Sequence, residues 1–495
     1  MNVTVSKHPK RTNGTSRNGG DETSGPRATA RRVVHLSVAE RSARGTAARA
    51  EVGRRAHGQW EPANVGRDPV DLLEEQAQTR VPELVPVRYG RMLVSPFTFF
   101  RGAAYLMAAD LALAPRTDLQ VQLCGDAHLS NFGVFAAPDR RLVFSLNDFD
   151  ETHPGPFEWD VKRLVASFEV AARDRGFDAK RRRSVNRTVT RAYREAMHGF
   201  AEMRTMDLWY ARVDVDDVVA RWAGQLTGKA RKRLEGNLAK ARSKDSLRAL
   251  TKLTHIVDGE PRIVSDPPLI VPIEDTVPPA EYANLDANLH NIIRSYRRTL
   301  SGDRRSLLER FQYAHAARKV VGVGSVGTRA WIVLMLGRDG EDPLLLQAKE
   351  AEASVLEPFL GTSAFANHGQ RVVEGQRLTQ AASDIMLGWI RVDGVDGRKR
   401  DFYLRQLWDA KGSAIVEAMN PKVMTIYAQL CGWTLARAHA RSGDAVAIAS
   451  YMGSGDAFDR AIAGFADSYA NQNERDYQAL STAAASGRVR AETGL

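Results

Sequence analysis

Two short polar segments carry residue types suited to holding a divalent cation beside a reacting group. They are CGDAHLSNFG at 124–133 and NDFDE at 147–151, and each follows an apolar run that indicates a strand. The polar side chains within them are Asp126, His128, Asn131, Asp148 and Asp150. Carboxylate and amide oxygens are the hard ligands that Mg²⁺ takes, with substrate phosphates completing its octahedron. The alternative interpretation of these segments is purely structural, namely an acidic turn capped by an asparagine.

The spacing in these segments matches the order of catalytic groups in protein kinases. In those enzymes a catalytic aspartate is followed by a metal-binding asparagine and then by a D-F-G loop whose aspartate also binds metal. Here Asp126 precedes Asn131 by five residues, and D-F-D at 148–150 takes the place of D-F-G. The pattern predicts that Asp126 orients or deprotonates an acceptor hydroxyl, with His128 assigned to the same catalytic group. The predicted metal ligands are Asn131, Asp148 and Asp150.

A glycine-rich segment in the second half of the chain predicts a phosphate-binding loop. Residues 322–327 read GVGSVG, which fits both a dinucleotide-binding turn and a kinase glycine-rich loop. A dinucleotide-binding turn opens a helix, whereas the run TRAWIVLML that follows favours a strand. Lys349 stands 22 residues past Gly327 in LLLQAK and resembles the strand lysine that reaches nucleotide phosphates. The predicted nucleotide-binding residues are Gly322, Gly324, Ser325, Gly327 and Lys349.

Kinases also hold that lysine with a glutamate on a helix. Glu374, central in RVVEGQR, is the first choice for this role, although an exposed helical glutamate would give the same pattern. Three glutamates nearer to Lys349 in sequence are alternatives: Glu350, Glu352 and Glu357. For Lys349 itself, the alternative is a strand-end lysine that reaches solvent.

The elements that must position these groups follow from hydrophobic periodicity. The order is helices, then a small antiparallel sheet with one helix, then helices again, and a proline-rich linker is expected at 264–280. Helices are predicted over 68–80, 98–114, 159–175, 180–203, 224–252 and 367–382, and after Lys411. Strands are predicted over 121–124, 142–146, 319–323, 330–337, 344–351, 384–392 and 401–407.

Composition excludes several classes of protein. With 495 residues, 43% of them hydrophobic and 26% charged, the chain is expected to form two or three globular domains. It contains no run of about 18 apolar residues, and its polar start does not match a secretory signal. Two cysteines, Cys124 and Cys431, are too few for a disulfide framework or a multi-cysteine zinc site. A cytoplasmic location is therefore predicted.

The positive charge is concentrated at the start of the chain. Residues 1–57 carry a net charge of +8 out of the total of +11, which leaves +3 for the remaining 438 residues. This segment is rich in serine, glycine and arginine and lacks aromatic residues, so we expect a disordered, solvated arm, with the ordered body beginning near Trp60. Weak contact with a polyanion is the functional alternative.

The two polar segments resemble those of a known enzyme class. CGDAHLSN and NDFDE resemble the H-G-D-x-H-x-x-N motif and the following aspartate of aminoglycoside phosphotransferase-like kinases, with Cys124 in place of the first histidine. Asp160, in GPFEWDVKRL, resembles the helix aspartate that steadies the catalytic loop in such enzymes. Together with SPFTFFRG, KVVGVGSVGT, GQRVVEGQR and FYLRQLWDAKGS, these motifs resemble the bacterial family called domain of unknown function 2252. That resemblance runs from about Trp60 to Tyr477 and implies a kinase-like site without specifying a substrate.

The resemblance also implies a fold. The glycine-rich loop and the lysine follow the catalytic loop by about 200 residues, whereas they precede it in ordinary kinases. We therefore expect an α+β, protein-kinase-like, two-lobe fold that is circularly permuted. The expected parts are a helical lobe over 58–280, a small sheet lobe over 281–410 and C-terminal helices over 411–495. Gly324, Lys349, Asp126 and Asp148 should then line one cleft.

The predicted function is an ATP- and Mg²⁺-dependent phosphotransferase that acts on a hydroxyl acceptor, with nucleotidyl transfer left open. A non-catalytic nucleotide-binding regulator is one alternative, motivated by the replacement at Cys124. A metal-dependent phosphoesterase is another, and it is disfavoured because the chain has 11 histidines and no H-x-H pair. Nothing in the sequence identifies the acceptor.

Overall fold

The computed structural model has an α+β fold with antiparallel sheets. It describes residues 34–60, 67–222, 246–276, 290–320, 326–393, 397–407 and 412–493, together with Ala410 and isolated residues between 228 and 239. Residues 38–495 form one compact unit, and the elements below belong to it. In the part of the chain that the structure describes, no helix combines the length and the apolar character that a membrane crossing requires.

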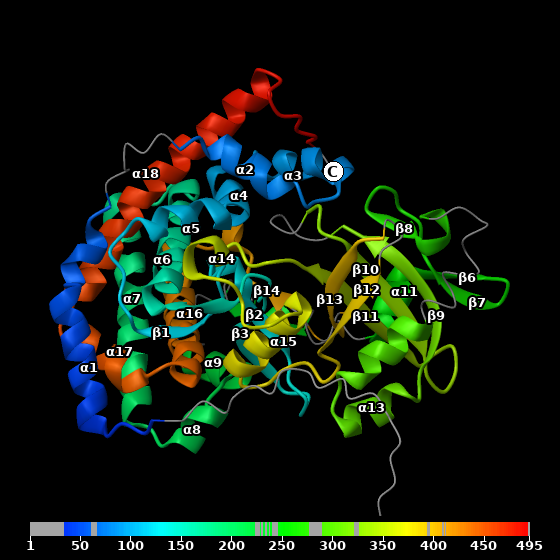
Figure 1. The fold of residues 1–495 in the computed structure, drawn as a ribbon, viewed down its shortest axis with the longest axis horizontal. Coiled ribbons are helices and arrows are strands. Elements are labelled where there is room, and N and C mark those ends of the chain that lie inside the picture. Colours follow the sequence, from blue (N-terminus) through cyan, green and yellow to red (C-terminus); the bar gives the residue numbers. More distant parts are fainter. Residues whose placement is uncertain are drawn as a thin grey trace, which may run out of the picture. The chain divides into compact units, whose positions relative to one another are not determined.

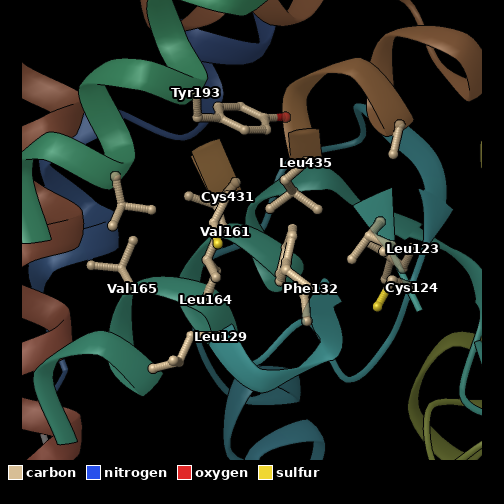
Figure 2. Packing of buried hydrophobic residues seen from close by; sticks show 14 of the residues in the cluster. Leu123, Cys124, Leu129, Phe132, Val161, Leu164, Val165, Tyr193, Cys431 and Leu435 are labelled. Carbon is tan, nitrogen blue, oxygen red and sulfur yellow. The ribbon is translucent and has the colours of Figure 1, made fainter. Parts of the chain in front are cut away.

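The helical part is organised around four long helices, α6 (Phe157–Asp174), α7 (Ala179–Glu202), α16 (Pro421–Ser442) and α18 (Ala457–Ala485). Helices α16 and α18 both pack against α6 and α7, so that the C-terminal helices complete the core of the first half (Figure 1). Figure 2 shows this core around Phe132, Leu164, Tyr193 and Leu435. Cys431 is buried there, and both cysteines are free thiols.

The expected disorder of residues 1–57 is wrong for the stretch from 38 onward. Helix α1 (Val38–Glu51) and a 3₁₀ turn (Arg54–Gly58) pack on α17 (Ala445–Met452) and α18. Arg49 Nε donates to the Tyr451 carbonyl at 2.9 Å, and Arg54 donates to the Met452 carbonyl at 2.6 Å. The arginines that made this segment look like a solvated arm therefore satisfy open carbonyls at the C-terminus of α17. Residues 1–33 lie outside the described residues.

The largest sheet has six antiparallel strands in the order β12-β13-β11-β10-β9-β8 (Figure 1). In chain order these are β8 (Ile270–Pro272), β9 (Gln312–Lys319), β10 (Ala330–Leu336), β11 (Pro343–Ala351), β12 (Gly388–Asp393) and β13 (Lys399–Gln406). Helix α15 (His368–Thr379) lies between β11 and β12 in the chain.

The two faces of this sheet are covered by different helices. Leu346 and Ala348 of β11 pack with Tyr296 of the helical residues 290–298, whereas Leu345 packs with Ala249 of α11 (Ser246–Leu253) on the other face. Alternate residues of one strand therefore serve two separate cores, as the period-2 geometry of a strand requires. Lys349 is on the same face as Leu345.

Parts of the sequence-based assignment differ from the structure. The expected linker at 264–280 supplies the edge strand β8, which pairs with β9, and α11 also packs on the sheet, so the division at residue 280 does not separate helical and sheet parts. The helix expected over 98–114 is two helices, α4 (Pro96–Gly102) and α5 (Ala104–Ala112), because Ala103 leaves the helical region. Most of 224–245, and the strand expected at 319–323 beyond Val320, lie outside the described residues.

Two small sheets hold the polar segments. Strand β1 (Gln120–Leu123) pairs with β4 (His153–Pro156), so one two-stranded ladder anchors the start of the first segment and the end of the second. The four-stranded sheet β14-β2-β3-β5 comprises Gly412–Ser413, Phe132–Ala136, Leu142–Leu146 and Val213–Asp214. Its hairpin β2–β3 joins the other two ends of the polar segments, which brings the loops 124–131 and 147–152 side by side.

Candidate active site

The loop 124–131 is fixed by a carboxylate in the first turn of α6. Asp160 accepts hydrogen bonds from the Cys124 amide at 2.7 Å and from the Gly125 amide at 3.0 Å, and its Oδ2 atom lies 3.3 Å from His439 Nε2. Gly125 has φ +85°, and a Cβ atom there would clash with the Glu151 carbonyl. Asp160 therefore holds the loop, as its resemblance to the helix aspartate of aminoglycoside phosphotransferase-like kinases implies. Gly125 allows the second loop to approach the first.

Asp126 lies at the centre of the loop and is paired with a buried arginine. Arg163 of α6 reaches Asp126 Oδ1 with Nε at 2.9 Å and Nη2 at 2.8 Å. His128 Nε2 lies 3.7 Å from Asp126 Oδ2. Burial raises the pKa of Asp126 while Arg163 opposes that rise, and burial together with Arg101 and Arg163 lowers the pKa of His128 well below its usual value. His128 is therefore a neutral imidazole beside the carboxylate.

Asn131 is oriented by the backbone of the same loop. Its Nδ2 atom donates to the Asp126 carbonyl at 2.7 Å. Because a carbonyl can only accept, this contact identifies the amide nitrogen and leaves Oδ1 as the oxygen available to a ligand. This orientation fits the predicted role of Asn131 as a metal ligand.

The second loop carries a pair of buried aspartates and meets the six-stranded sheet. Lys349 Nζ of β11 forms an ion pair with Asp150 Oδ2, and the Tyr403 hydroxyl donates to Asp150 Oδ1 at 2.8 Å. Burial and the neighbouring Asp150 raise the pKa of Asp148. Burial would also raise the pKa of Asp150, but Lys349 and Tyr403 lower it, so Asp150 is the ionised partner of a charged lysine.

Glu374 does not take the place predicted for it. It pairs with Arg377 on its own helix at 3.2 Å, and its side chain is 38% exposed, whereas that of Lys349 is 4% exposed. In α15, Gly375 packs against Thr152, whereas Glu374 is half-exposed on the side of the helix that carries Arg377. The carboxylate on Lys349 is supplied by Asp150 instead. The alternatives have other partners: Glu350 contacts Arg329 and Arg400, Glu352 contacts Thr79, and Glu357 accepts from the Ser354 and Ser363 amides.

Arg371, one turn before Glu374, is the residue of α15 that faces the site. Its guanidinium is fully buried and donates to three carbonyls, those of Thr152 at 2.7 Å, Asp150 at 2.8 Å and Glu352 at 2.7 Å. It thereby ties the second polar loop to the end of β11. Sequence reasoning missed this residue, although its position three residues before the chosen glutamate was an available signal.

The glycine-rich segment is described at one end. Gly322, Gly324 and Ser325 lie outside the described residues. Gly327 has φ +93°, its carbonyl accepts from the Val81 amide at 2.8 Å, and Arg80 packs against its Cα position. The segment therefore ends at a left-handed turn that glycine favours, in contact with the residues after α2 (Pro69–Ala77).

One cavity of about 570 Å³ brings Asp126 and Asp148 together as predicted, whereas Lys349 is not among its lining residues and Gly324 lies outside the described residues. Its lining includes all five predicted catalytic and metal-binding side chains, Asp126, His128, Asn131, Asp148 and Asp150. The other walls include residues of α2, the α4–α5 junction, Thr328 after the glycine-rich segment, the end of β11 and α14 (Glu357–Leu360). Arg101 and Glu151 also line it, and sequence reasoning assigned neither, although Arg101 stands in the quoted SPFTFFRG motif. Burial raises the pKa of Glu151 to about 7.

The oxygen groups at this cavity suit a hard cation that shares its coordination with a phosphate. Across the described residues, His, Cys, Asp and Glu side chains do not gather in groups of three or more around a single metal position. Mg²⁺ commonly takes one or two protein carboxylates and fills its remaining positions with water and phosphate oxygens. Asp148, Asp150 and the Asn131 amide oxygen meet that smaller requirement.

Comparison with known proteins gives one family. A family model described as an uncharacterised protein conserved in bacteria (DUF2252) matches residues 80–483. No curated protein and no solved structure matches the chain. The matched range contains both polar loops, the glycine-rich segment, Lys349 and the C-terminal helices that support them.

Proposed function

We propose that this chain, which belongs to the bacterial family of domain of unknown function 2252, is an ATP- and Mg²⁺-dependent phosphotransferase that acts on a hydroxyl acceptor. The observation that carries the proposal is the buried Lys349–Asp150 ion pair. Through it, the lysine strand that follows the glycine-rich segment meets the cavity lined by Asp126, Asn131 and Asp148. Each of these groups was selected from the sequence for a role in phosphoryl transfer.

The order of elements in the six-stranded sheet supports a kinase-like, circularly permuted arrangement. The glycine-rich segment joins β9 to β10, Lys349 lies on the next strand, β11, and α15 follows. A glycine-rich loop, then a lysine on the third strand, then a helix is the order used by protein kinases. In this chain that unit follows the catalytic loop, so the proposed nucleotide lobe comes second in sequence.

In the proposed reaction the acceptor oxygen forms a new bond to the γ-phosphorus. The bond from that phosphorus to the β–γ bridging oxygen breaks, and its electron pair stays on the ADP product. Asp126 orients the acceptor hydroxyl and receives its proton. Asn131, Asp148 and Asp150 would hold Mg²⁺, which would neutralise phosphate charge when bound. Lys349 contacts the α- and β-phosphates.

A second candidate, a non-catalytic nucleotide-binding regulator, is favoured by the Arg163–Asp126 ion pair. The guanidinium of Arg163 lowers the pKa of Asp126 and so offsets part of the gain in basicity that burial gives this carboxylate. The replacement at Cys124 does not favour this candidate, because the buried Cys124 still presents its amide to Asp160. Both cysteines are buried free thiols, which suits a reducing compartment, and we propose that the reaction occurs in the cytoplasm.

The test combines nucleotide binding with turnover. Mg²⁺–ATP should stabilise the wild-type protein by about 2.7 kcal/mol at roughly 100-fold excess over its dissociation constant. The shift should require Mg²⁺, which EDTA removes, and Lys349→Met should weaken it. An ATP-consumption assay with panels of hydroxyl acceptors then separates the two candidates. Absence of a shift with every Mg²⁺–nucleotide would reject both, and a shift without ATP consumption would favour the regulator.

A further inference from the structure

The next-to-last residue of the SPFTFFRG motif is Arg101, whose backbone is held on both sides. Arg101 lies in the last turn of α4 and lines the same cavity as Asp126. The carbonyl before it, of Phe100, accepts from Arg163 Nη2 at 2.7 Å. The carbonyl after it, of Gly102, accepts from Arg88 Nη2 at 2.9 Å. Since Arg163 also binds Asp126, one guanidinium fixes the Arg101 backbone and the Asp126 carboxylate relative to each other.

The start of α4 is fixed as well. Ser95 and Thr98 form a capping box, with Thr98 N to Ser95 Oγ at 3.2 Å and Ser95 N to Thr98 Oγ1 at 2.8 Å. Gly102 packs so closely on Met92 that a Cβ atom there would lie 2.7 Å from its sulfur. Helix α4 is therefore held at both ends, which is the kind of support that keeps a functional side chain in place.

The guanidinium of Arg101 is half-buried, and its N–H groups are available to a ligand. Its Nε atom is buried without a hydrogen-bond partner, and among the described residues no hydrogen bond or ion pair engages the rest of the group. Burial lowers the pKa of Arg101, while Asp126, Glu417 and Asp148 act in the opposite direction. The negative charge of these carboxylates favours the charged form of Arg101 beside Asp126, and none of them accepts a hydrogen bond from its guanidinium. Arg163, by contrast, donates hydrogen bonds to the Asp126 carboxylate and to the Phe100 carbonyl.

The cavity needs a cation at this position if a phosphoryl group is to enter it. Asp126 and Asp148 would both repel phosphate oxygens. Lys349 is paired with Asp150. The positive charge of Lys349 is therefore not placed at the part of the cavity that Asp126 lines. A guanidinium presents a planar fork of N–H donors that matches two phosphoryl oxygens, and it keeps its charge in a buried setting.

We infer that Arg101 is a catalytic residue that binds the transferred phosphoryl group on the Asp126 side of the cavity. The inference rests on the proposed function and adds a group to it. As the acceptor oxygen bonds to phosphorus and the bond to the ADP oxygen breaks, the Arg101 N–H groups donate to the oxygens of the moving phosphoryl group. Arg101 gains and loses no proton, and the acceptor proton goes to Asp126.

The test uses Mg²⁺–ADP with and without aluminium fluoride, which mimics the phosphoryl group in flight and needs no identified acceptor. Dissociation constants come from thermal shift or calorimetry. For the wild type, aluminium fluoride should tighten Mg²⁺–ADP binding about 100-fold or more. Arg101→Gln should lose nearly all of this tightening and keep the affinity for Mg²⁺–ADP alone within about threefold. Arg101→Lys, which keeps the charge and loses the fork, should fall between the two.

Arg175→Gln, on an exposed arginine at the end of α6, is the matched control and should behave as wild type. If Arg101→Gln does not fold, Arg101→Lys decides, since its tightening must fall below that of wild type. Wild-type tightening in either folded Arg101 variant, or none in the wild type, overturns the inference while the proposed function stands. Failure of the wild type to bind any Mg²⁺–nucleotide rejects the proposed function itself, and the inference with it.

Discussion

Lys349 and Asp150 are 199 residues apart in the chain and form a buried ion pair between strand β11 and the loop after β3. The pair is an electrostatic contact between the six-stranded sheet and the Asp-rich loops, and Arg405 of β13 adds a hydrogen bond to the Asn147 carbonyl at 3.3 Å. Tyr403, from the neighbouring strand β13, donates to the same carboxylate. The sheet and the loops are therefore positioned relative to each other by charge as well as by packing.

Removing one partner of this pair should be costly. Asp150→Ala leaves the buried Lys349 ammonium without its carboxylate, and we expect a loss of about 3–5 kcal/mol in the free energy of unfolding. Adding Lys349→Met should recover part of that loss, because the uncompensated charge is then absent. Urea unfolding of the two single variants and the double variant measures the coupling, which should be about 1–3 kcal/mol. Additive losses would mean that the pair does not act as a unit.

Asp148→Asn should separate metal binding from folding. Burial raises the pKa of Asp148, and the like charge of the neighbouring Asp150 raises it further. A neutral amide removes that repulsion, so the metal-free variant should be more stable than wild type by about 0.5–2 kcal/mol. The Mg²⁺-dependent part of the nucleotide stabilisation should fall, because a charged oxygen ligand is lost. Thermal melts with EDTA and with Mg²⁺–ATP give both readouts, and an unchanged Mg²⁺-dependent shift would argue against the ligand role.

Asp126→Asn should keep nucleotide binding and lose turnover. The amide oxygen can still accept from Arg163, so the loop is retained, but the group can no longer take a proton. We expect ATP consumption to fall by about 10²–10⁴-fold. The Mg²⁺–ATP thermal shift should stay close to that of wild type. A variant that consumes ATP at the wild-type rate would remove Asp126 from the chemistry.

Arg371→Lys should loosen the second polar loop. A lysine ammonium cannot span the Thr152, Asp150 and Glu352 carbonyls that the guanidinium reaches. We expect at least two buried carbonyls to lose a charged donor, which should lower the free energy of unfolding by about 2–4 kcal/mol and weaken Mg²⁺–nucleotide binding. Arg377→Lys, on the half-exposed side of the same helix, is the matched control. Equal effects of the two changes would deny Arg371 its positioning role.

How much of this site the sequence could predict depends on how far apart in the chain the contacting residues lie. Asp160 and the five cavity-lining groups could be selected because they stand in short motifs with fixed spacing, and the structure brings the five together at one cavity. Glu374 was chosen by residue type, but the side of α15 that faces the site is set by the close packing of Gly375 on Thr152. Helix α1 and the 3₁₀ turn after it were missed because Arg49 and Arg54 bind carbonyls about 400 residues later in the chain, and net charge carries no information about such acceptors.

The packing of this N-terminal segment predicts a pH dependence. Burial and Lys162 lower the pKa of His57 from 6.5 to about 3, and its Nε2 atom lies 2.7 Å from the Tyr451 hydroxyl. Between these pH values the unfolded chain binds a proton that the folded chain excludes, so the free energy of unfolding falls as the pH falls. From pH 6.5 to 5 the His57 contribution should be a loss of about 2 kcal/mol. His57→Gln should flatten this part of the stability curve, whereas His255→Gln, at an exposed position, should not. If the N-terminal segment were disordered, the wild type and His57→Gln would give identical curves of unfolding free energy against pH.

The supports of the loop 124–131 also set the order in which the site can form during protein synthesis. Tyr427 of α16 donates to the Leu129 and Phe132 carbonyls, and His439 of the same helix lies beside Asp160. Tyr427 is 298 residues downstream of Leu129. At about 5–20 residues per second, a ribosome needs roughly 15–60 seconds to make that stretch. For that time the emerging chain carries the loop 124–131 without its helical support, so the cavity that this loop lines is complete only after α16 has been made.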